Sequence, residues 1–466
     1  MTAHAQLDGA ALGVVWALPF AGILLSIATG PVLYPHLWER HTGKFAALWA
    51  ALVIVPLYLF TDETVVTHTL AHTVLRDYLP FILLLLALYT VAGGLYVEGN
   101  LHDSAFTNTV LLGVGALLAS VVGTTGASMI LIRPLIRAND DRRFNAHVVV
   151  FFIFLVSNIG GALSPLGDPP LFLGFLRGVD FFWTTVHLLP HTLFAAGLVL
   201  AVFMVIDVIL HHREGNFPKK NDPTPDSPLR LHGKVNLVLL VVIIAAILMS
   251  ASWKPGLSVT VLGTELQVPD LLRDAIFVGV TFASLALTGA EHRRANDFKW
   301  GPIEEVALLF AGIFICIVPV MAMLQAGAHG AFAPLVALVS HADGTPNNIA
   351  YFWLTGGLSS FLDNAPTYLV FFELAGGNAQ TLMTSGAATL AAISAGAVFM
   401  GANSYIGNAP NFMVYAIARD AGVRMPSFFG YMLWSGMVLS PVFLQMTPLF
   451  FVSGNAKRPI YTYRLP

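Results

Sequence analysis

Two aspartates stand inside apolar segments at points where a regular helix cannot continue. Asp168 lies in "LVSNIGGALSPLGDPPLFLGFL" (Leu155–Leu176), and Asp363 lies in "FLDNAPT" (Phe361–Thr367). A residue that precedes proline is pushed out of the α region, and proline donates no backbone hydrogen bond. We therefore expect the helix around Asp168 to stop and to restart at the prolines. Such a break frees backbone carbonyls beside a carboxylate, which together could bind a cation.

Uncharged oxygen-bearing side chains gather around both aspartates. Hard cations such as sodium take oxygen ligands of this kind, although each group alone could instead form a hydrogen bond between helices. The predicted cation and proton site comprises Asp168, Asp363, Asn364, Asn158, Asn403 and Asn408. Supporting oxygens are expected from Thr124, Thr125, Ser128, Ser157, Ser164, Thr367 and Ser404. The helix breaks and turns are assigned to Gly160, Gly161, Gly167, Pro169, Pro170, Pro366, Gly407 and Pro410.

A purely structural role for the aspartates is the alternative, since Asp168 could cap the restarted helix and Asp363 could initiate a turn. An internal comparison argues against it. The chain contains two similar halves offset by 240 residues. At the matched positions of these halves stand Asn408, opposite Asp168, and Gly123, opposite Asp363. Each half thus makes one of these turns without a carboxylate. Because an ionisable group within a membrane costs about 3 kcal/mol or more, capping alone explains the aspartates poorly.

The composition is that of an integral membrane protein. Of the 466 residues 56% are hydrophobic and 11% are charged, and the mean hydropathy is +0.74. Soluble domains carry about 25% charged residues. Only helices and closed barrels satisfy their backbone in lipid, so the repeated apolar segments predict an all-α polytopic fold. The single cysteine excludes a disulfide scaffold. The sequence shows no candidate set of enzymatic residues, no cofactor motif and no nucleic-acid partner; its expected partners are the lipid bilayer and small cations.

Apolar blocks between polar segments predict ten candidate spans. They are residues 10–33, 45–60, 78–97, 147–175, 186–210, 235–250, 275–290, 303–324, 387–418 and 428–452. Basic residues cluster at 40–44, 133–143, 213–234 and 292–299, which places these segments in the cytoplasm and the N-terminus outside. Under this topology the apolar segments 106–136 and 349–374 must enter and return on one side, as re-entrant hairpins. The C-terminal basic residues Lys457, Arg458 and Arg464 then lie outside, against the positive-inside rule. Basic residues near the end of a chain determine its orientation only weakly.

The chain is expected to consist of two halves joined by a proline-rich cytoplasmic linker, 211–234. Residues 1–98 form N-terminal scaffold spans, and 99–210 form a first repeat with hairpin 106–136 and broken span 147–175. Residues 235–325 form further scaffold spans. The second repeat, 326–452, contains hairpin 349–374, broken span 387–418 and the last span 428–452, and 453–466 is a tail.

Short sequence matches at a fixed offset of 240 residues support the predicted repeat. "LLASVVGTTGASM" (Leu117–Met129) matches "GLSSFLDNAPTYL" (Gly357–Leu369), and "LGDPPLF" (Leu166–Phe172) matches "IGNAPNF" (Ile406–Phe412). The few identities leave chance resemblance as an alternative. Because the two hairpins are oppositely oriented, we expect inverted repeats with broken helices that meet at the bilayer midplane, as in many secondary transporters.

At "SNIGGALSPLGDPPLFLGFL", "FLDNAPTYL" and "GANSYIGNAPNFMVYA" the sequence resembles the ion transporter superfamily. Within it, the resemblance is to the NhaD-like sodium/proton antiporters and their citrate-transporter-like (CitMHS) relatives. It implies a scaffold domain, a moving transport domain with two hairpins, a homodimer and elevator-like alternating access. The sodium-coupled dicarboxylate members carry Ser-Asn-Thr motifs at both tips, whereas these tips read "TTGAS" and "DNAPT". The aspartates look like the acidic residues of the antiporter branch.

The leading hypothesis is therefore exchange of sodium or lithium for protons by a multi-pass protein of a bacterial inner membrane. Protonation and sodium binding would compete for Asp168 and Asp363. No Lys or Arg stands near the predicted site in the sequence motifs, and two unpaired aspartates would repel an anion. The alternative is a cation-coupled symporter of citrate or a related organic anion, held by hydroxyls and half-helix N-termini. A passive channel is the weaker alternative, because no ring of pore-lining polar residues is evident.

Overall fold

The protein is an all-α polytopic membrane protein, as predicted. The structure, a computed structural model, describes residues 7–100, 104–215 and 227–452. Nine helical segments in these ranges are long and apolar enough to cross a bilayer. They are Val14–Pro31, Arg40–Phe60, Glu63–Gly93, Ala105–Val122, Ala146–Leu163, Phe181–Glu214, Val235–Ser252, Gly301–Gln325 and Phe428–Phe451.

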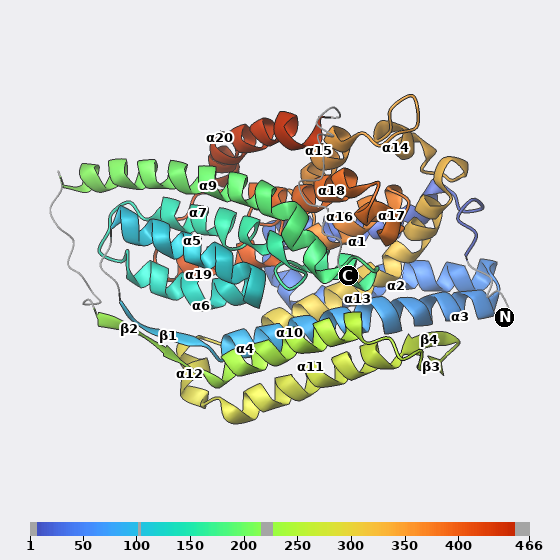
Figure 1. Ribbon diagram of the computed structural model, residues 1–466, viewed down its shortest axis with the longest axis horizontal. Helices are drawn as coiled ribbons and strands as arrows, with labels where there is room; N and C mark the ends of the chain where they lie inside the picture. The colour runs from blue at the N-terminus through green and yellow to red at the C-terminus, as the bar shows by residue number, and fades with distance from the viewer. Residues whose placement is uncertain (1–6, 101–103, 216–226, 453–466) are drawn as a thin grey trace, which may run out of the picture.

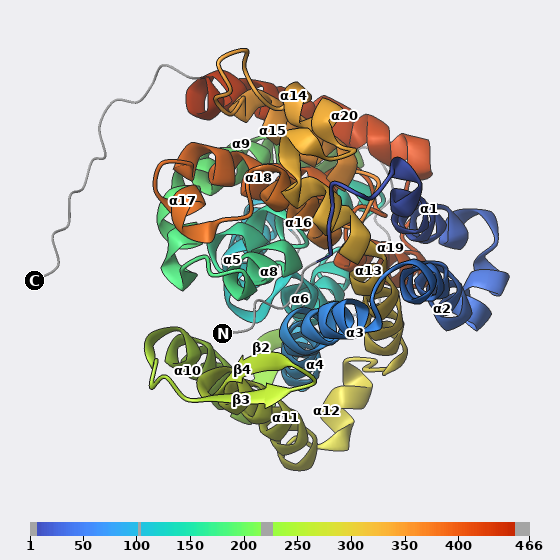
Figure 2. The ribbon, with the colours of Figure 1, turned by 90° about the vertical axis from the view of Figure 1, so that its right-hand side faces the viewer.

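One set of helices, here called the scaffold group, packs around two central helices, α4 and α13. A pair of N-terminal helices covers α13, while α10 and α11 pack on each other and on α4. Figure 2, which looks along the helices, shows α10 and α11 below α4, with α1 and α2 beside α13. The members are α1 (Leu18–Leu33), α2 (Pro35–Phe60), α3 (Glu63–His72), a π-helical turn (Thr73–Tyr78), α4 (Leu79–Gly93), α10 (Val235–Ser252), α11 (Val268–Leu287) and α13 (Gly301–Gln325).

Most of the remaining helices form the site group, which packs on the scaffold group where α6 meets α4 and α16 meets α13. The edge of this group farthest from α10 and α11 is formed by α9 and α20, which pack against each other (Figure 1). Its first-half members are α5 (Ala105–Val122), α6 (Thr124–Arg137), α7 (Ala146–Leu155), α8 (Pro169–Leu176) and α9 (Phe181–Glu214). Those of the second half are α15 (Asn348–Ser359), α16 (Asn364–Leu374), α17 (Ala379–Met383), α18 (Ala387–Met400), α19 (Ala409–Asp420) and α20 (Phe428–Met446).

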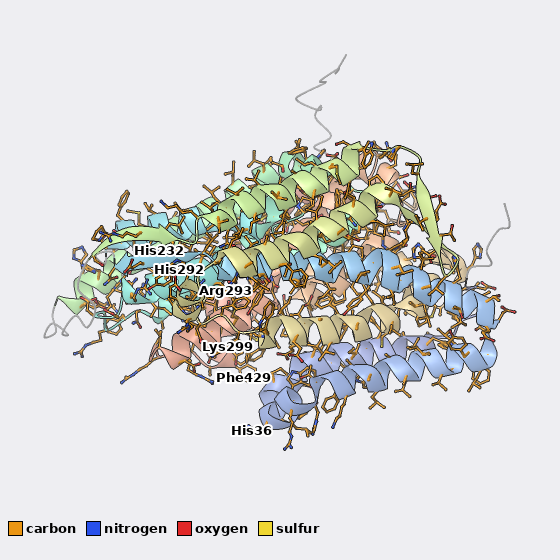
Figure 3. All side chains as sticks on the ribbon, turned by 90° about the horizontal axis from the view of Figure 1, so that it is seen from below. His36, His232, His292, Arg293, Lys299 and Phe429 are labelled. Carbon is orange, nitrogen blue, oxygen red and sulfur yellow. The ribbon has the colours of Figure 1, made fainter. Side chains whose placement is uncertain are left out.

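Two small β-ribbons mark opposite ends of the molecule (Figure 1). At one end β1 (Tyr96–Asn100) pairs antiparallel with β2 (Ser227–His232), and at the other β3 (Ser258–Val261) pairs with β4 (Thr264–Gln267). Figure 3 places His232, His292, Arg293 and Lys299 toward the β1–β2 end. These residues belong to the basic segments predicted to be cytoplasmic, so the β1–β2 end is the predicted inner end.

The boundaries of the predicted spans were accurate near the helix breaks and, in the scaffold, at α10 and α13, whereas α2, α4 and α11 differ from their predicted ranges by more. The span predicted at 78–97 is the end of a longer helical run, Glu63–Gly93, so the predicted start of this span at residue 78 is wrong. Asp62 caps this helix by accepting from the Thr64 N–H at 2.8 Å. Of the predicted linker, α9 reaches Glu214 and β2 begins at Ser227, while 216–226 lie outside the described residues. The tail, 453–466, with Lys457, Arg458 and Arg464, also lies outside them.

The orientation can be tested by thiol labelling, because the only cysteine, Cys316, is buried. In a Cys316→Ser background we expect Thr260→Cys, on exposed β3, to react with a membrane-impermeant maleimide in intact cells. Leu229→Cys, on exposed β2, should react only after permeabilisation. The physical reason is that the basic residues at the β1–β2 end hold it in the cytoplasm. The reverse labelling pattern would contradict the predicted topology.

Candidate functional site

The first broken span consists of α7, a 3₁₀ turn (Ile159–Leu163) and α8. Asp168 stands directly before α8 in an extended conformation, and α8 begins with Pro169 and Pro170. The break is tightly folded, because a Cβ atom on Gly167 would lie 2.0 Å from the Gly161 carbonyl oxygen. Only glycine fits there. The predicted stop and restart of this helix are found where the sequence placed them.

The second broken span repeats this arrangement with α18, a 3₁₀ turn (Gly401–Asn403) and α19. Asn408 stands before α19 as Asp168 stands before α8, 240 residues earlier. A Cβ atom on Gly407 would lie 2.6 Å from the Gly401 carbonyl oxygen, the counterpart of the contact between Gly167 and Gly161.

Matched hydrogen bonds join each break to its hairpin. The Ser164 hydroxyl donates to the Ser120 carbonyl at 2.5 Å, and the Ser404 hydroxyl donates to the Ser360 carbonyl at 2.5 Å. Both members of this second pair lie 240 residues beyond the first. These contacts support the predicted repeat, while its inverted membrane topology stays a prediction.

The two predicted hairpins are helix–turn–helix units whose tips reach the breaks. In the first, Gly123 separates α5 from α6 with a φ of +82°, a left-handed value that favours glycine. The next residue, Thr124, donates its N–H to the Gly167 carbonyl at 2.7 Å. In the second unit Asp363 precedes α16 with a φ of −55°, so this tip needs no glycine. That the hairpins enter and return on one side of the bilayer remains a prediction.

The Asp168 carboxylate is the centre of the polar cluster, and both halves of the chain contribute to it. Its Oδ1 accepts from Asn408 Nδ2 at 3.1 Å and from the Thr124 hydroxyl at 3.2 Å, while Oδ2 accepts from Asn364 Nδ2 at 2.5 Å. All four side chains are buried. Thr124 and Asn364 stand at matched positions of the two tips, so a tip from each half donates to one carboxylate.

The two aspartates differ in whether they cap the helix that follows them. Asp168 makes no side-chain hydrogen bond to the first turn of α8, so it does not act as a cap in the structure. Asp363 does cap α16, because its Oδ1 accepts from the Ala365 N–H at 3.0 Å. Thr367 adds to this turn by donating its hydroxyl to the Asp363 carbonyl at 2.9 Å. Only at Asp363 is a structural role visible beside the predicted one.

A second layer of amides holds the two breaks together. Asn158 donates to the Ile153 carbonyl at 2.8 Å and to Asn411 Oδ1 at 2.7 Å. Asn411 in turn donates to the Gly401 and Ser404 carbonyls at 2.8 and 3.0 Å. The helix breaks leave these carbonyls without intrahelical partners, and the amides satisfy them.

Other predicted oxygens take part in local contacts. Ser128 and Ser157 share a hydrogen bond of 2.9 Å between α6 and the first break. Asn403 donates to the Ser360 hydroxyl at 2.9 Å, away from Asp168, so it supports the second break rather than the central cluster. Pro366 and Pro410 lie in the first turns of α16 and α19, where a missing N–H costs nothing.

A cavity of about 100 Å³ separates the cluster from the scaffold group. Asp363, Thr124, Thr125 and Asn408 supply polar lining, whereas Asp168 lies behind them and is not in the lining. The opposite wall is apolar and comes from α4 and α13, with Leu84, Leu88, Val306 and Phe310. No Lys or Arg of the described chain lines this cavity.

Several candidate functional residues were not identified from the sequence. Asn411 lies three residues past Asn408 in an apolar segment and gives no local signal. Ser120 and Ser360 could have been found, because they are aligned in the matched hairpin segments. Asp207, within α9, is also buried, and it binds Arg142 at 2.5 Å and His147 at 2.9 Å near the inner end.

Helix–turn–helix units and broken helices that meet in a buried polar cluster are typical of secondary transporters. The profile of one protein family, described as "Putative citrate transport", matches residues 9–451. The chain therefore belongs to this family, the citrate-transporter-like branch of the ion transporter superfamily, and the resemblance seen in the sequence is confirmed. Membership makes it a secondary transporter in a membrane. No curated protein sequence matches the chain.

The amide layer predicts a stability effect at Asn411. Asn411→Ala should lower the free energy of unfolding by about 1–3 kcal/mol, because it leaves a buried Asn158 donor and two carbonyls without partners. The measurement is the thermal unfolding midpoint in detergent. Ser252→Ala is the control, since it removes one exposed bond to the Leu248 carbonyl and should change the midpoint little. Equal midpoints for both variants would contradict the role assigned to Asn411.

Proposed function

We propose that the protein exchanges sodium, or lithium, for protons by alternating access, with Asp168 as the group that carries either ion. One observation carries the proposal. Asp168 is buried, and its hydrogen-bond partners in the described chain, Asn408, Thr124 and Asn364, are all neutral. A carboxylate taken out of water without an opposite charge costs several kcal/mol. A proton or a small cation would remove that cost.

The donor set suits a hard cation. A carboxylate offers about four lone-pair positions, and three hydrogen bonds leave room for a further ligand. Asn364 Oδ1 is buried and has no hydrogen-bond partner in the structure, although the same amide donates to Asp168. Oxygens of this type bind sodium in place of its water shell. A proton on Asp168 would exclude the cation, so the two ions compete for one site.

The position of Asp363 suggests a path to Asp168. Asp363 lines the cavity next to the scaffold group, whereas Asp168 lies behind Thr124 and Asn408. A cation that enters the cavity would meet Asp363 first and then displace the proton from Asp168. The resemblance adds a homodimer and a bacterial inner membrane to the proposal.

Coupled transport of citrate or a related anion is the second candidate, and the description of the family favours it. The aspartates would then bind the coupling cation. The cavity favours cation exchange instead, because its lining contains a carboxylate and no Lys or Arg. An organic anion placed there would meet negative charge without compensation.

We expect sodium alone to collapse a pH gradient, acid inside, across proteoliposomes that contain the wild-type protein. The collapse should need no organic anion, and a pH-sensitive dye trapped inside measures it. Asp168→Asn should reduce the rate to that of empty liposomes, because an amide neither carries a proton nor neutralises sodium. If sodium alone leaves the pH gradient unchanged but drives uptake of citrate, the symport alternative is correct.

Asp363→Asn separates charge from capping. Asparagine caps a helix as well as aspartate, so the turn should persist while the charge is lost, and we expect the exchange rate to fall by roughly tenfold or more. Asp62→Asn is the matched control. Asp62 accepts from the N–H two residues ahead, as Asp363 does, but it is exposed at the outer end. Full activity of Asp363→Asn would reduce Asp363 to a structural cap.

A further inference from the structure

A cluster of charged side chains lies at the outer end of the site group. Arg177, the residue after α8, contacts Asp77 Oδ2 at 3.1 Å and Glu373 Oε1 at 3.3 Å. Gln325 donates to Glu373 Oε2 at 3.4 Å. The side chains of Arg177, Asp77 and Glu373 are 23%, 10% and 4% exposed. These four residues are called the outer ion-pair cluster.

The cluster stands at the far ends of the two helices that begin at the cation site. α8 lies between Asp168 and Arg177, and α16 begins at Asn364 and carries Glu373 one residue before its end. The two helices pack against each other. At 1.5 Å per residue, the eight residues of α8 span about 12 Å. A hydrogen bond from Asn364 to Asp168 therefore joins the pair at one end, and the ion pair between Arg177 and Glu373 joins it at the other.

The cluster also ties this helix pair to the scaffold group. Asp77 belongs to the π-helical turn Thr73–Tyr78, and Gln325 is the last residue of α13. Short π-helical turns inside α-helices recur at functional sites, and here the turn lies where Asp77 meets Arg177. The outer ion-pair cluster therefore contains residues of both the scaffold group and the site group.

Two cavities flank the cluster. One, of about 570 Å³, is lined by Arg177, Gln325 and Glu373, and the other, of about 170 Å³, is lined by Asp77, Arg177 and Met321. The cavity beside Asp363 instead reaches Pro302 and Ile303, at the inner end of α13. The cluster therefore lies between the outer cavities and the site.

We infer that Arg177 is a positioning residue for the cation site, and that its ion pair with Asp77 fastens the site helices to the scaffold at the outer end. Through Glu373 it keeps α8 parallel to α16, so that Asp168 and Asn364 meet. Through Asp77 it holds the site closed toward the outside, and this contact must break when the site opens there. The inference rests on the proposed function, since it concerns the same site.

The kinetic test compares variants of the two contacts. Glu373→Gln weakens the tie between α8 and α16, so we expect the KM for sodium to rise by roughly tenfold, because loss of one partner of a buried ion pair leaves the charge of Arg177 without this compensation. Asp77→Asn leaves that tie intact, so kcat should change while KM stays close to wild type. Arg177→Gln should show both effects, and Arg177→Lys should restore part of the loss because it keeps the charge.

A matched control lies on the same side of the molecule. Arg273 pairs with Asp270 and Asp274 at 3.0 and 2.9 Å, and all three residues belong to α11 of the scaffold group. Arg273→Gln breaks an ion pair whose partners all lie on α11 and leaves the contacts of Arg177 in place, so both constants should remain near wild type. If Arg273→Gln changes KM and kcat as Arg177→Gln does, the effect is general loosening and the inference is wrong.

Thiol labelling gives a readout that does not depend on which ion is carried. In a Cys316→Ser background, Met321→Cys places a thiol beside the cluster at a buried position of α13. Adding Arg177→Gln or Asp77→Asn should increase its labelling by an impermeant reagent from outside, and adding Arg273→Gln should not. Unchanged labelling in both cluster variants overturns the inference. Absent sodium-driven exchange with increased labelling would refute the proposed function and leave the outer closure standing.

Discussion

The cost of burying one carboxylate constrains the whole structure. Asp168 has 1% of its surface exposed, and the groups that touch it are neutral donors. Such donors stabilise an ionised carboxylate only in part, and under the proposed function a proton or a cation supplies the remaining compensation. The two helix breaks, the hairpin tips and the amide layer around Asn158 and Asn411 all serve to bring donors to this one group.

The two halves have similar helix breaks and hairpin tips, but they carry different side chains at the matched positions. At each matched position of the cluster one half supplies a residue that the other lacks: Asp168 against Asn408, Asn364 against Thr124, and Asp363 against Gly123. Strict symmetry would place two aspartates where Asn408 now donates to Asp168 at 3.1 Å. Two carboxylates at that distance could not both ionise. The asymmetry therefore leaves a single central charge, which one monovalent cation or one proton can neutralise.

Local chemistry explains which features the sequence could predict. Proline and glycine act on their own backbone, so α8 begins at Pro169 and α18 at Ala387, as expected. The helix Glu63–His72 was missed because its threonines, histidines and a glutamate lower the local hydropathy. Asp168 and Asp363 were found because charges are rare in apolar segments. Arg177 was not, since its partners lie 100 and 196 residues away and no spacing along the chain reveals them.

Under the proposed function, the same desolvation cost would also couple the two ions, in addition to the closure by the outer ion-pair cluster. A proton or a sodium ion on Asp168 would neutralise that carboxylate, and passage of the site along the apolar wall formed by Leu84, Leu88, Val306 and Phe310 would then carry less electrostatic cost. With neither bound, the site is a bare carboxylate, and moving it against that wall costs about 3 kcal/mol or more. Under the proposed function, the loaded forms would therefore cross far more often than the empty one. Since each crossing would then carry one ion, movement of sodium in one direction would require movement of protons in the other.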